Sequence, residues 1–169
     1  MSLYETLSLI LAIVSIAALL WQVRVALQSI HADHERRKKQ ATIEFLMAQV
    51  RPLWTEGRHL LDKKWGTGVL NEDSLKQIED DPEARVIVTS LLGHLEYLSV
   101  GINTGIYDKD ILFRASGTSM IRLFHRLRPY IKLSQKNQVT AYIEFENLIH
   151  DLEERKRKKP PVDGNIIHS

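Results

Sequence analysis

The pattern of hydrophobic and polar residues divides the chain into an apolar N-terminal segment and a longer amphipathic remainder. Residues 6–23 form an uncharged stretch of 18 residues, which as an α-helix extends for roughly 27 Å, about the thickness of the hydrocarbon core of a bilayer. Tyr4 and Trp21 lie near its two ends, where aromatic side chains meet the membrane interface. A signal peptide carries positive charge before its apolar core, whereas the charge here is Glu5. We therefore predict a transmembrane anchor over residues 1–24.

Helical periodicity continues beyond the anchor. No Gly or Pro occurs from Val25 to Arg51, which predicts a juxtamembrane helix over residues 25–51. We expect Pro52 to kink or restart this helix rather than to abolish the pattern. The apolar residues recur with a period of 3.6 on both sides of Pro52: Ile43, Leu46 or Met47, Val50, Leu53 or Trp54, and Leu60 or Leu61.

Caps and turn residues divide the rest of the chain into further helices. We expect these helices over residues 74–79, 82–100, 109–127 and 138–158. Asp81 followed by Pro82 is typical of an N-cap and a first helical position, and Asp108 is an N-cap candidate for the third helix. Pro129 is expected to interrupt that helix. Strand patterns and internal repeats are not evident.

These elements predict an all-α fold, in which an N-terminal transmembrane helix continues into a cytoplasmic helical bundle of about four main helices. The predicted organisation is an anchor over residues 1–24, a juxtamembrane helix over residues 25–51, a helical domain over residues 52–159 and a disordered tail over residues 160–169.

The charge distribution sets the expected orientation. Of the 44 formal charges, only Glu5 and Arg24 lie in the first 24 residues. Arg24 and the cluster Arg36–Lys39 follow the apolar stretch, so the positive-inside rule places the C-terminal domain in the cytoplasm and the N-terminus outside. We expect a single-pass protein of the bacterial inner membrane. The absence of Cys excludes a disulfide framework, Cys-based zinc sites and thiol nucleophiles.

Small and weakly polar residues recur along one face of the anchor. The residues of this stripe are Ser8, Ala12, Ser15, Ala18 and Gln22. Such stripes allow transmembrane helices to approach closely and to hydrogen-bond across the contact, so we predict a homo-oligomer. Ordinary membrane-helix composition is the alternative, because Ser and Ala are common in such helices.

Basic residues gather in two clusters. The first consists of Arg36, Arg37, Lys38 and Lys39, and the second of Arg155, Lys156, Arg157, Lys158 and Lys159. Without these nine charges the chain would be net negative. Membrane lipid with anionic headgroups is the expected partner. Nucleic acid and a protein partner remain open, and a solvated helix face is the simplest alternative.

One row of charged residues predicts structural ion pairing. Arg114, Arg122 and Arg126 are separated by multiples of four residues, and Glu96 lies on an otherwise apolar helix face. We expect the Glu96 carboxylate to pair with this row.

We find no P-loop, dinucleotide-binding fingerprint, HExxH or GxSxG motif. The sequence therefore predicts no catalytic residue and no cofactor site. His31 and His34 form an incomplete metal site, so no metal is predicted either.

The segment from Leu92 to Ile131 carries a resemblance to a known family. Leu95-Glu96, the run GINTGIYD at residues 101–108, and residues 122–131 resemble an uncharacterised family of bacterial and phage proteins. That resemblance implies one N-terminal membrane helix, a cytoplasmic helical domain and no known catalysis. The layout is also similar to that of the small membrane accessory protein of type VI-B CRISPR systems, which forms an oligomeric pore with HEPN-like helices.

These observations favour a protein that acts by assembly at the membrane, as a pore or effector in antiviral defence, rather than an enzyme. The alternative is a degenerate HEPN-like ribonuclease, or an RNA-binding module, tethered to the membrane. Arg24 and His31 have a spacing compatible with the HEPN motif but lie at the membrane boundary. A ribonuclease would need a convergent pair of an arginine and a histidine on the cytoplasmic domain, such as His125 near an arginine across a dimer.

Overall fold

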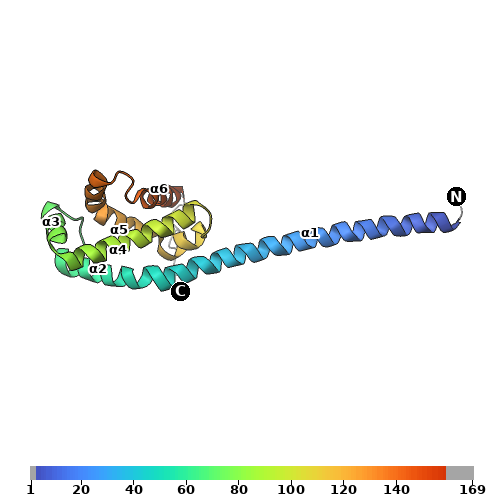
Figure 1. The fold of residues 1–169 in the computed structure, drawn as a ribbon, viewed down its shortest axis with the longest axis horizontal. Helices are drawn as coiled ribbons and strands as arrows, with labels where there is room; N and C mark the ends of the chain where they lie inside the picture. Colours follow the sequence, from blue (N-terminus) through green and yellow to red (C-terminus); the bar gives the residue numbers. More distant parts are fainter. Residues whose placement is uncertain (1–2, 159–169) are drawn as a thin grey trace, which may run out of the picture. The chain divides into compact units, whose positions relative to one another are not determined.

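The computed structural model describes residues 3–158, except for the side chains of Leu3, Glu5, Thr6, Leu9, Ile10 and Ala12. In chain order the elements are α1 (Leu3–Phe45), the π-helix η1 (Leu46–Val50), α2 (Arg51–Trp65), α3 (Glu72–Asp80), α4 (Pro82–Asn103), α5 (Lys109–Asn137) and α6 (Ile143–Lys158) (Figure 1). Residues 3–158 contain no strand, so the prediction of an all-α fold is confirmed.

The chain divides into two compact units between Gln40 and Ala41. The second unit therefore contains the end of α1 and all later helices, whereas the sequence suggested a boundary near Pro52. The predicted tail over residues 160–169, with Lys159 of the second basic cluster, lies outside the described residues.

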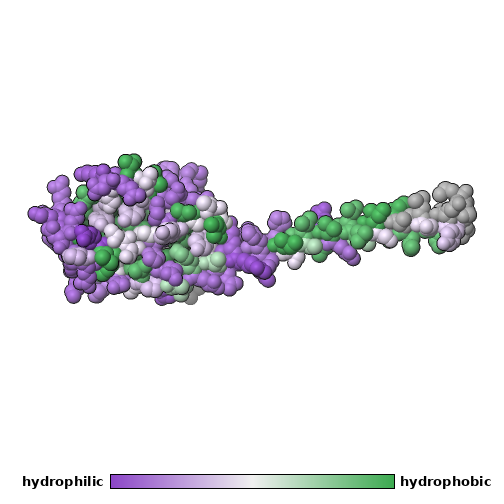
Figure 2. All heavy atoms as spheres, in the orientation of Figure 1, coloured by the Kyte–Doolittle hydropathy of each residue, from purple (hydrophilic) through white to green (hydrophobic). Residues whose placement is uncertain are grey.

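In the first unit the described residues all belong to α1, up to Gln40, and the apolar part of this helix is exposed. A window of 18 residues in the helical run from Ile13 has a mean hydropathy of 1.6, and none of it is buried. Figure 2 shows mainly hydrophobic side chains over this part of α1. Helix α4 is also long and apolar enough to cross a membrane, but 44% of its window is buried, as expected for a core helix. By length and composition, α1 is the candidate membrane span.

Pro52 restarts the helix, as the sequence predicts. Proline has no N–H to donate to the carbonyl four residues earlier, so one α-helical hydrogen bond is lost at this position. The preceding turn, η1, widens to a π-helix in which the Arg51 N–H donates to the Leu46 carbonyl. Helix α2 then begins with Pro52 in its first turn, where a missing N–H has no cost.

Helix α4 is the centre of the second unit and packs against η1, α2, α3 and α6. The sequence places Glu96 on an otherwise apolar helix face, and this is confirmed: Leu91, Leu95, Leu98 and Ile102 of α4 are all buried. The other large contributions to the core come from Leu112, Met120, Leu127 and Ile131 of α5 and from Phe145, Leu148, Ile149 and Leu152 of α6.

The predicted caps are confirmed. The Asp81 carboxylate accepts hydrogen bonds from the N–H groups of Glu83 and Ala84 at the start of α4. The Asp108 carboxylate accepts one from the Ile111 N–H at the start of α5. The Asp108 N–H also donates to the Thr42 hydroxyl at 2.7 Å, which ties this cap to the last turn of α1.

Two predicted boundaries are wrong. Pro129 does not interrupt α5, which continues to Asn137, because burial of Leu127, Tyr130 and Ile131 on both sides of the proline holds the helix together. Helix α6 begins at Ile143 rather than at residue 138. The preceding residues form a turn that ends at Tyr142, whose φ of 59° is incompatible with a right-handed helix.

Candidate functional site

The small-residue stripe of the anchor lies on one helix face, because α1 is continuous through it. The side chains of Ser8, Ser15, Ala18 and Gln22 are exposed, whereas the side chain of Ala12 lies outside the described part. The Ser15 hydroxyl donates to the Leu11 carbonyl at 2.8 Å. It therefore remains available to a second helix only as an acceptor.

The first basic cluster lies on α1 and faces solvent. Arg36, Arg37 and Lys39 are exposed, and Lys38 is half-buried. Arg37 forms an ion pair with Asp33, one turn earlier, at 2.9 Å. Because both side chains are largely exposed, this pair adds little stability and does not prevent Arg37 from meeting an anionic surface.

The second basic cluster is partly occupied by contacts within the chain. Arg155 pairs with Asp110 at 2.5 Å and covers the ring of Phe113, which fastens α6 to α5. Lys158 pairs with Glu154 at 2.6 Å. Lys156 and Arg157 form no ion pair with the described residues, so about half of this cluster remains for an external partner.

Glu96 does not pair with the arginine row, which corrects the prediction. Its carboxylate accepts hydrogen bonds from the N–H groups of Glu144, at 3.1 Å, and Phe145, at 2.8 Å. These groups belong to the first turn of α6, where N–H groups have no partner within the helix. Glu96 therefore caps α6 from the neighbouring helix α4, and its negative charge meets the positive end of the helix dipole.

The three arginines of the row have different environments. Arg126 is 8% exposed and pairs with Asp62 of α2 at 2.5 Å. Arg114 and Arg122 are exposed and form no ion pair with the described residues. Only Arg126 therefore has the structural role that the sequence suggested, and its partner is Asp62 rather than Glu96.

Arg126 fastens α5 to α2 and to the loop that follows α2. Its guanidinium donates to the Gly66 carbonyl as well as to Asp62, and its own carbonyl accepts from the Leu70 N–H at 3.2 Å. The hydrogen bond from Arg126 lowers the pKa of the Asp62 carboxyl below its usual value. The Arg126 Nε is buried and has no hydrogen-bond partner among the described residues, an arrangement that costs about 1–3 kcal/mol when no ligand or water satisfies it.

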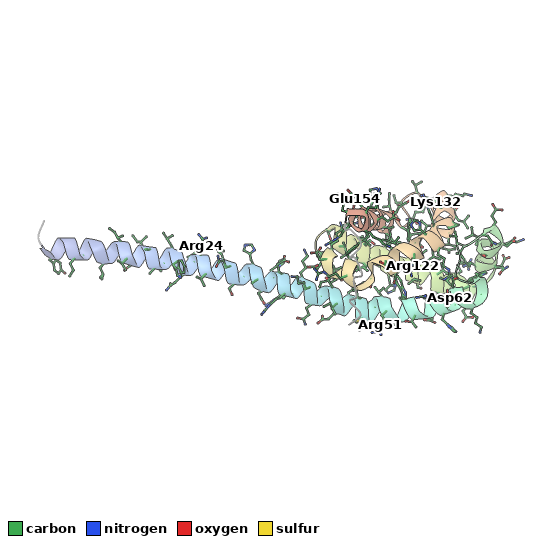
Figure 3. All side chains as sticks on the ribbon, turned by 180° about the vertical axis from the view of Figure 1, so that it is seen from behind. Arg24, Arg51, Asp62, Arg122, Lys132 and Glu154 are labelled. Atoms are coloured by element: carbon green, nitrogen blue, oxygen red, sulfur yellow. The ribbon has the colours of Figure 1, made fainter. Side chains whose placement is uncertain are left out.

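A cavity of about 210 Å³ opens between α2 and α5 beside this pair. Its lining consists of Trp54, Arg58, Asp62, Thr67, Ser119, Arg122, Leu123 and Arg126. Figure 3 labels Asp62 on α2 and Arg122 on α5, which belong to the two helices that form its walls. No motif in the sequence indicates this cavity, although Trp54, Arg58 and Asp62 recur every four residues and share one face of α2.

A second cavity, of about 320 Å³, borders the first and is mainly apolar. The two cavities share Trp54 and Ser119. The lining of the second is completed by Ile43, Leu46, Met47, Val50, Arg51, Ala115 and Ser116. A cationic cavity and an apolar cavity thus lie side by side along the η1–α2 and α5 helices.

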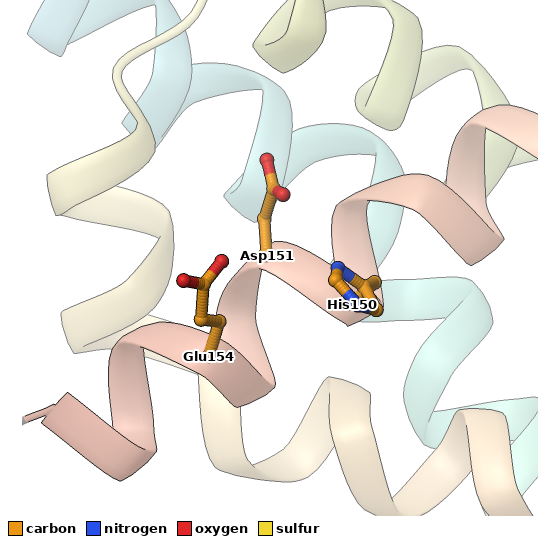
Figure 4. A group of neighbouring side chains, drawn as sticks. All are labelled: His150, Asp151 and Glu154. Carbon is orange, nitrogen blue, oxygen red and sulfur yellow. The ribbon is translucent and has the colours of Figure 1, made fainter.

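His150, Asp151 and Glu154 lie together on α6 (Figure 4), and one potential ligand atom of each lies within 4.8 Å of the others. Lys109 already neutralises the Asp151 carboxylate, and Lys158 neutralises that of Glu154. Two carboxylates paired with lysines on an exposed surface do not make a metal centre.

His125, which the sequence offers for the ribonuclease alternative, and His94 each contact a group other than arginine. His125 Nε2 lies 2.6 Å from a carboxylate oxygen of Glu153. His94 Nδ1 lies 2.8 Å from the Ser90 carbonyl in the preceding turn. Neither histidine forms a hydrogen bond with an arginine of the described residues.

The family described as a domain of unknown function, DUF4760, matches residues 3–152, so the chain belongs to this family. No curated protein and no solved structure matches the chain.

Proposed function

We propose that this member of the DUF4760 family is a single-pass inner-membrane protein that acts by assembly at the membrane. The observation that carries the proposal is the exposed apolar surface of α1. Leu11, Ile13, Val14, Ile16 and Leu20 are all 58% or more exposed. An apolar surface of this extent requires lipid or another apolar partner, and its length matches a bilayer.

The charge distribution supports an N-out orientation, with the helical unit in the cytoplasm. Arg24 and the first basic cluster follow the apolar part of α1, whereas no Lys or Arg precedes it. Alkaline phosphatase fused after Ser169 should be inactive in a bacterial host, because the enzyme requires an oxidising compartment. An active fusion would mean that the C-terminal unit lies outside the cytoplasm, and partners in the cytoplasm would then be excluded.

The small-residue stripe supports self-association through α1. Ser15→Leu combined with Ala18→Leu adds bulk to this face and keeps the helix apolar, so insertion should persist while the mass of the detergent-solubilised particle falls. Ile13→Leu combined with Ile16→Leu is the matched control on another face and should leave the mass unchanged. Equal masses for both double variants would mean that α1 is only a tether.

Assembly through α1 fits a pore or an effector, and the layout shared with the type VI-B accessory protein favours a role in antiviral defence. Measurement of inner-membrane permeability in infected cells would test both the conducting pore and the defence role. Expression of the chain should permeabilise the inner membrane during phage infection, and the Ser15→Leu, Ala18→Leu variant should not.

A further inference from the structure

We propose that the cavity between α2 and α5 binds a phosphate monoester group, and that the neighbouring apolar cavity holds the organic part of the same ligand. Both cavities lie within the second unit. This proposal therefore does not depend on membrane insertion or on self-association of α1.

The charge of the first cavity favours a dianion. Three guanidinium groups line it, those of Arg58, Arg122 and Arg126, against the single carboxylate of Asp62. No lysine lines it, and guanidinium matches the geometry of phosphate oxygens with two parallel donors, unlike an ammonium group. A phosphate monoester, with a charge of nearly −2 at neutral pH, balances the excess.

The donors of the cavity have unused hydrogen-bonding capacity. Arg122 forms no hydrogen bond or ion pair with the described residues, and Arg58 reaches Asp62 only through a 3.4 Å contact. The Arg126 Nε is buried and has no partner in the described part of the chain, while the rest of that guanidinium is held in place by Asp62 and Gly66. The hydroxyls of Thr67 and Ser119 line the same cavity. Only Arg126 is held in place, and all three guanidinium groups have donors to spare. An anion with several oxygens supplies the acceptors that such a group of donors needs.

The organic part of the ligand is inferred from the adjoining cavity. Ile43, Met47 and Trp54 give this space a mainly apolar lining. Trp54 lies at the boundary of the two cavities and offers an aromatic surface directly beside the arginines. A phosphate attached to a ring or an acyl chain would fill both cavities, whereas free phosphate would fill only the first.

A ligand with a phosphate monoester group can be either a lipid, such as phosphatidic acid, or a soluble phosphate ester. The test uses the full chain in an uncharged detergent and measures binding of phenyl phosphate and inorganic phosphate by calorimetry. We expect both probes to bind, with phenyl phosphate the tighter of the two. Arg122→Gln should weaken both at least about tenfold, the loss of about 1.4 kcal/mol expected for one charge-assisted contact.

Matched variants separate the site from general charge attraction. Arg114→Gln removes another exposed arginine of the same helix, one that does not line the cavity, and should leave both affinities unchanged. Met47→Ser should weaken phenyl phosphate but not inorganic phosphate. Absence of binding to the unmodified chain, or equal losses for Arg114→Gln and Arg122→Gln, would overturn the proposal.

A second measurement identifies the source. Phenyl phosphate is titrated into the full chain in nanodiscs that contain either phosphatidic acid or phosphatidylglycerol. If the lipid is the ligand, phosphatidic acid should abolish the titration signal and phosphatidylglycerol should not, because its phosphate is a diester. If the ligand is soluble, binding should be equal in both bilayers.

Discussion

Replacement of Glu96 tests whether the helical unit depends on a cap supplied by one helix to another. The Glu96 carboxylate, on α4, accepts from the N–H groups of Glu144 and Phe145 in the first turn of α6. Phe145 is fully buried, so this turn carries a major core side chain. Glu96→Ala leaves the two N–H groups without their acceptor and removes a negative charge from the positive end of the helix.

The expected loss follows from the nature of these bonds. A lost N-cap typically costs about 0.5–2 kcal/mol, and hydrogen bonds to charged groups contribute about 1.5–3 kcal/mol each. Because Glu96 is only half-buried, water replaces part of what is lost, and we expect the free energy of unfolding to fall by about 2–3 kcal/mol. For a domain of this size, Tm should fall by roughly 10 °C. Glu96→Gln keeps an acceptor oxygen but no charge, so its effect should be about half as large.

Two measurements check this expectation. Thermal unfolding of the full chain in detergent, followed by Trp fluorescence, gives the change in Tm. Amide hydrogen exchange gives the local effect: in Glu96→Ala, the exchange rate should increase most at the amides of Glu144 and Phe145. Glu56→Ala, at an exposed carboxylate on α2, is the control and should leave both unchanged. An unaltered melting curve and unaltered exchange in Glu96→Ala would refute the capping role.

Two further predictions concern packing and pH. Gly101→Ala should destabilise the second unit by about 1–3 kcal/mol in urea unfolding, because the added Cβ would lie 2.2 Å from the Tyr107 ring. Gly93→Ala should stabilise the unit by about 0.5–1 kcal/mol, because the added Cβ would have none of the described neighbouring atoms within 4 Å. The Arg126 hydrogen bond lowers the pKa of Asp62 in the folded state. Ionised Asp62 should therefore contribute its full share to the free energy of unfolding above the unfolded pKa near 4. This contribution should be lost as the pH falls through the lower folded pKa. Asp62→Asn should lose this part of the acid sensitivity measured by urea unfolding between about pH 2 and 5.

The fold was predictable where local chemistry alone decides the structure. The caps at Asp81 and Asp108 and the apolar face of α4 depend on residues close in sequence, and the structure confirms them. Pro129 shows the limit of such reasoning. A proline within a helix is unfavourable by its local geometry, but the buried residues around it stabilise α5 enough to continue through it.

The candidate site was less predictable because its contacts join distant segments. Asp62 and Arg126 are 64 positions apart, and Glu96 lies 48 and 49 positions from the amides that it caps. A sequence shows that a carboxylate on an apolar face needs donors, but it does not say whether a guanidinium or a helix N-terminus supplies them. Both are compatible with the same residue type.

The arginine row shows why spacing by four residues is a weak guide over several turns. Each residue of an α-helix advances by about 100°, so each step of four residues drifts by about 40°, and Arg126 lies about 120° around α5 from Arg114. The three arginines therefore do not share one face. Arg114 lies in solvent, Arg122 lines the cavity and Arg126 forms the buried pair. The same drift makes Arg114 and Arg122 an informative pair of variants. Both residues are exposed on α5, but only Arg122 lines the cavity.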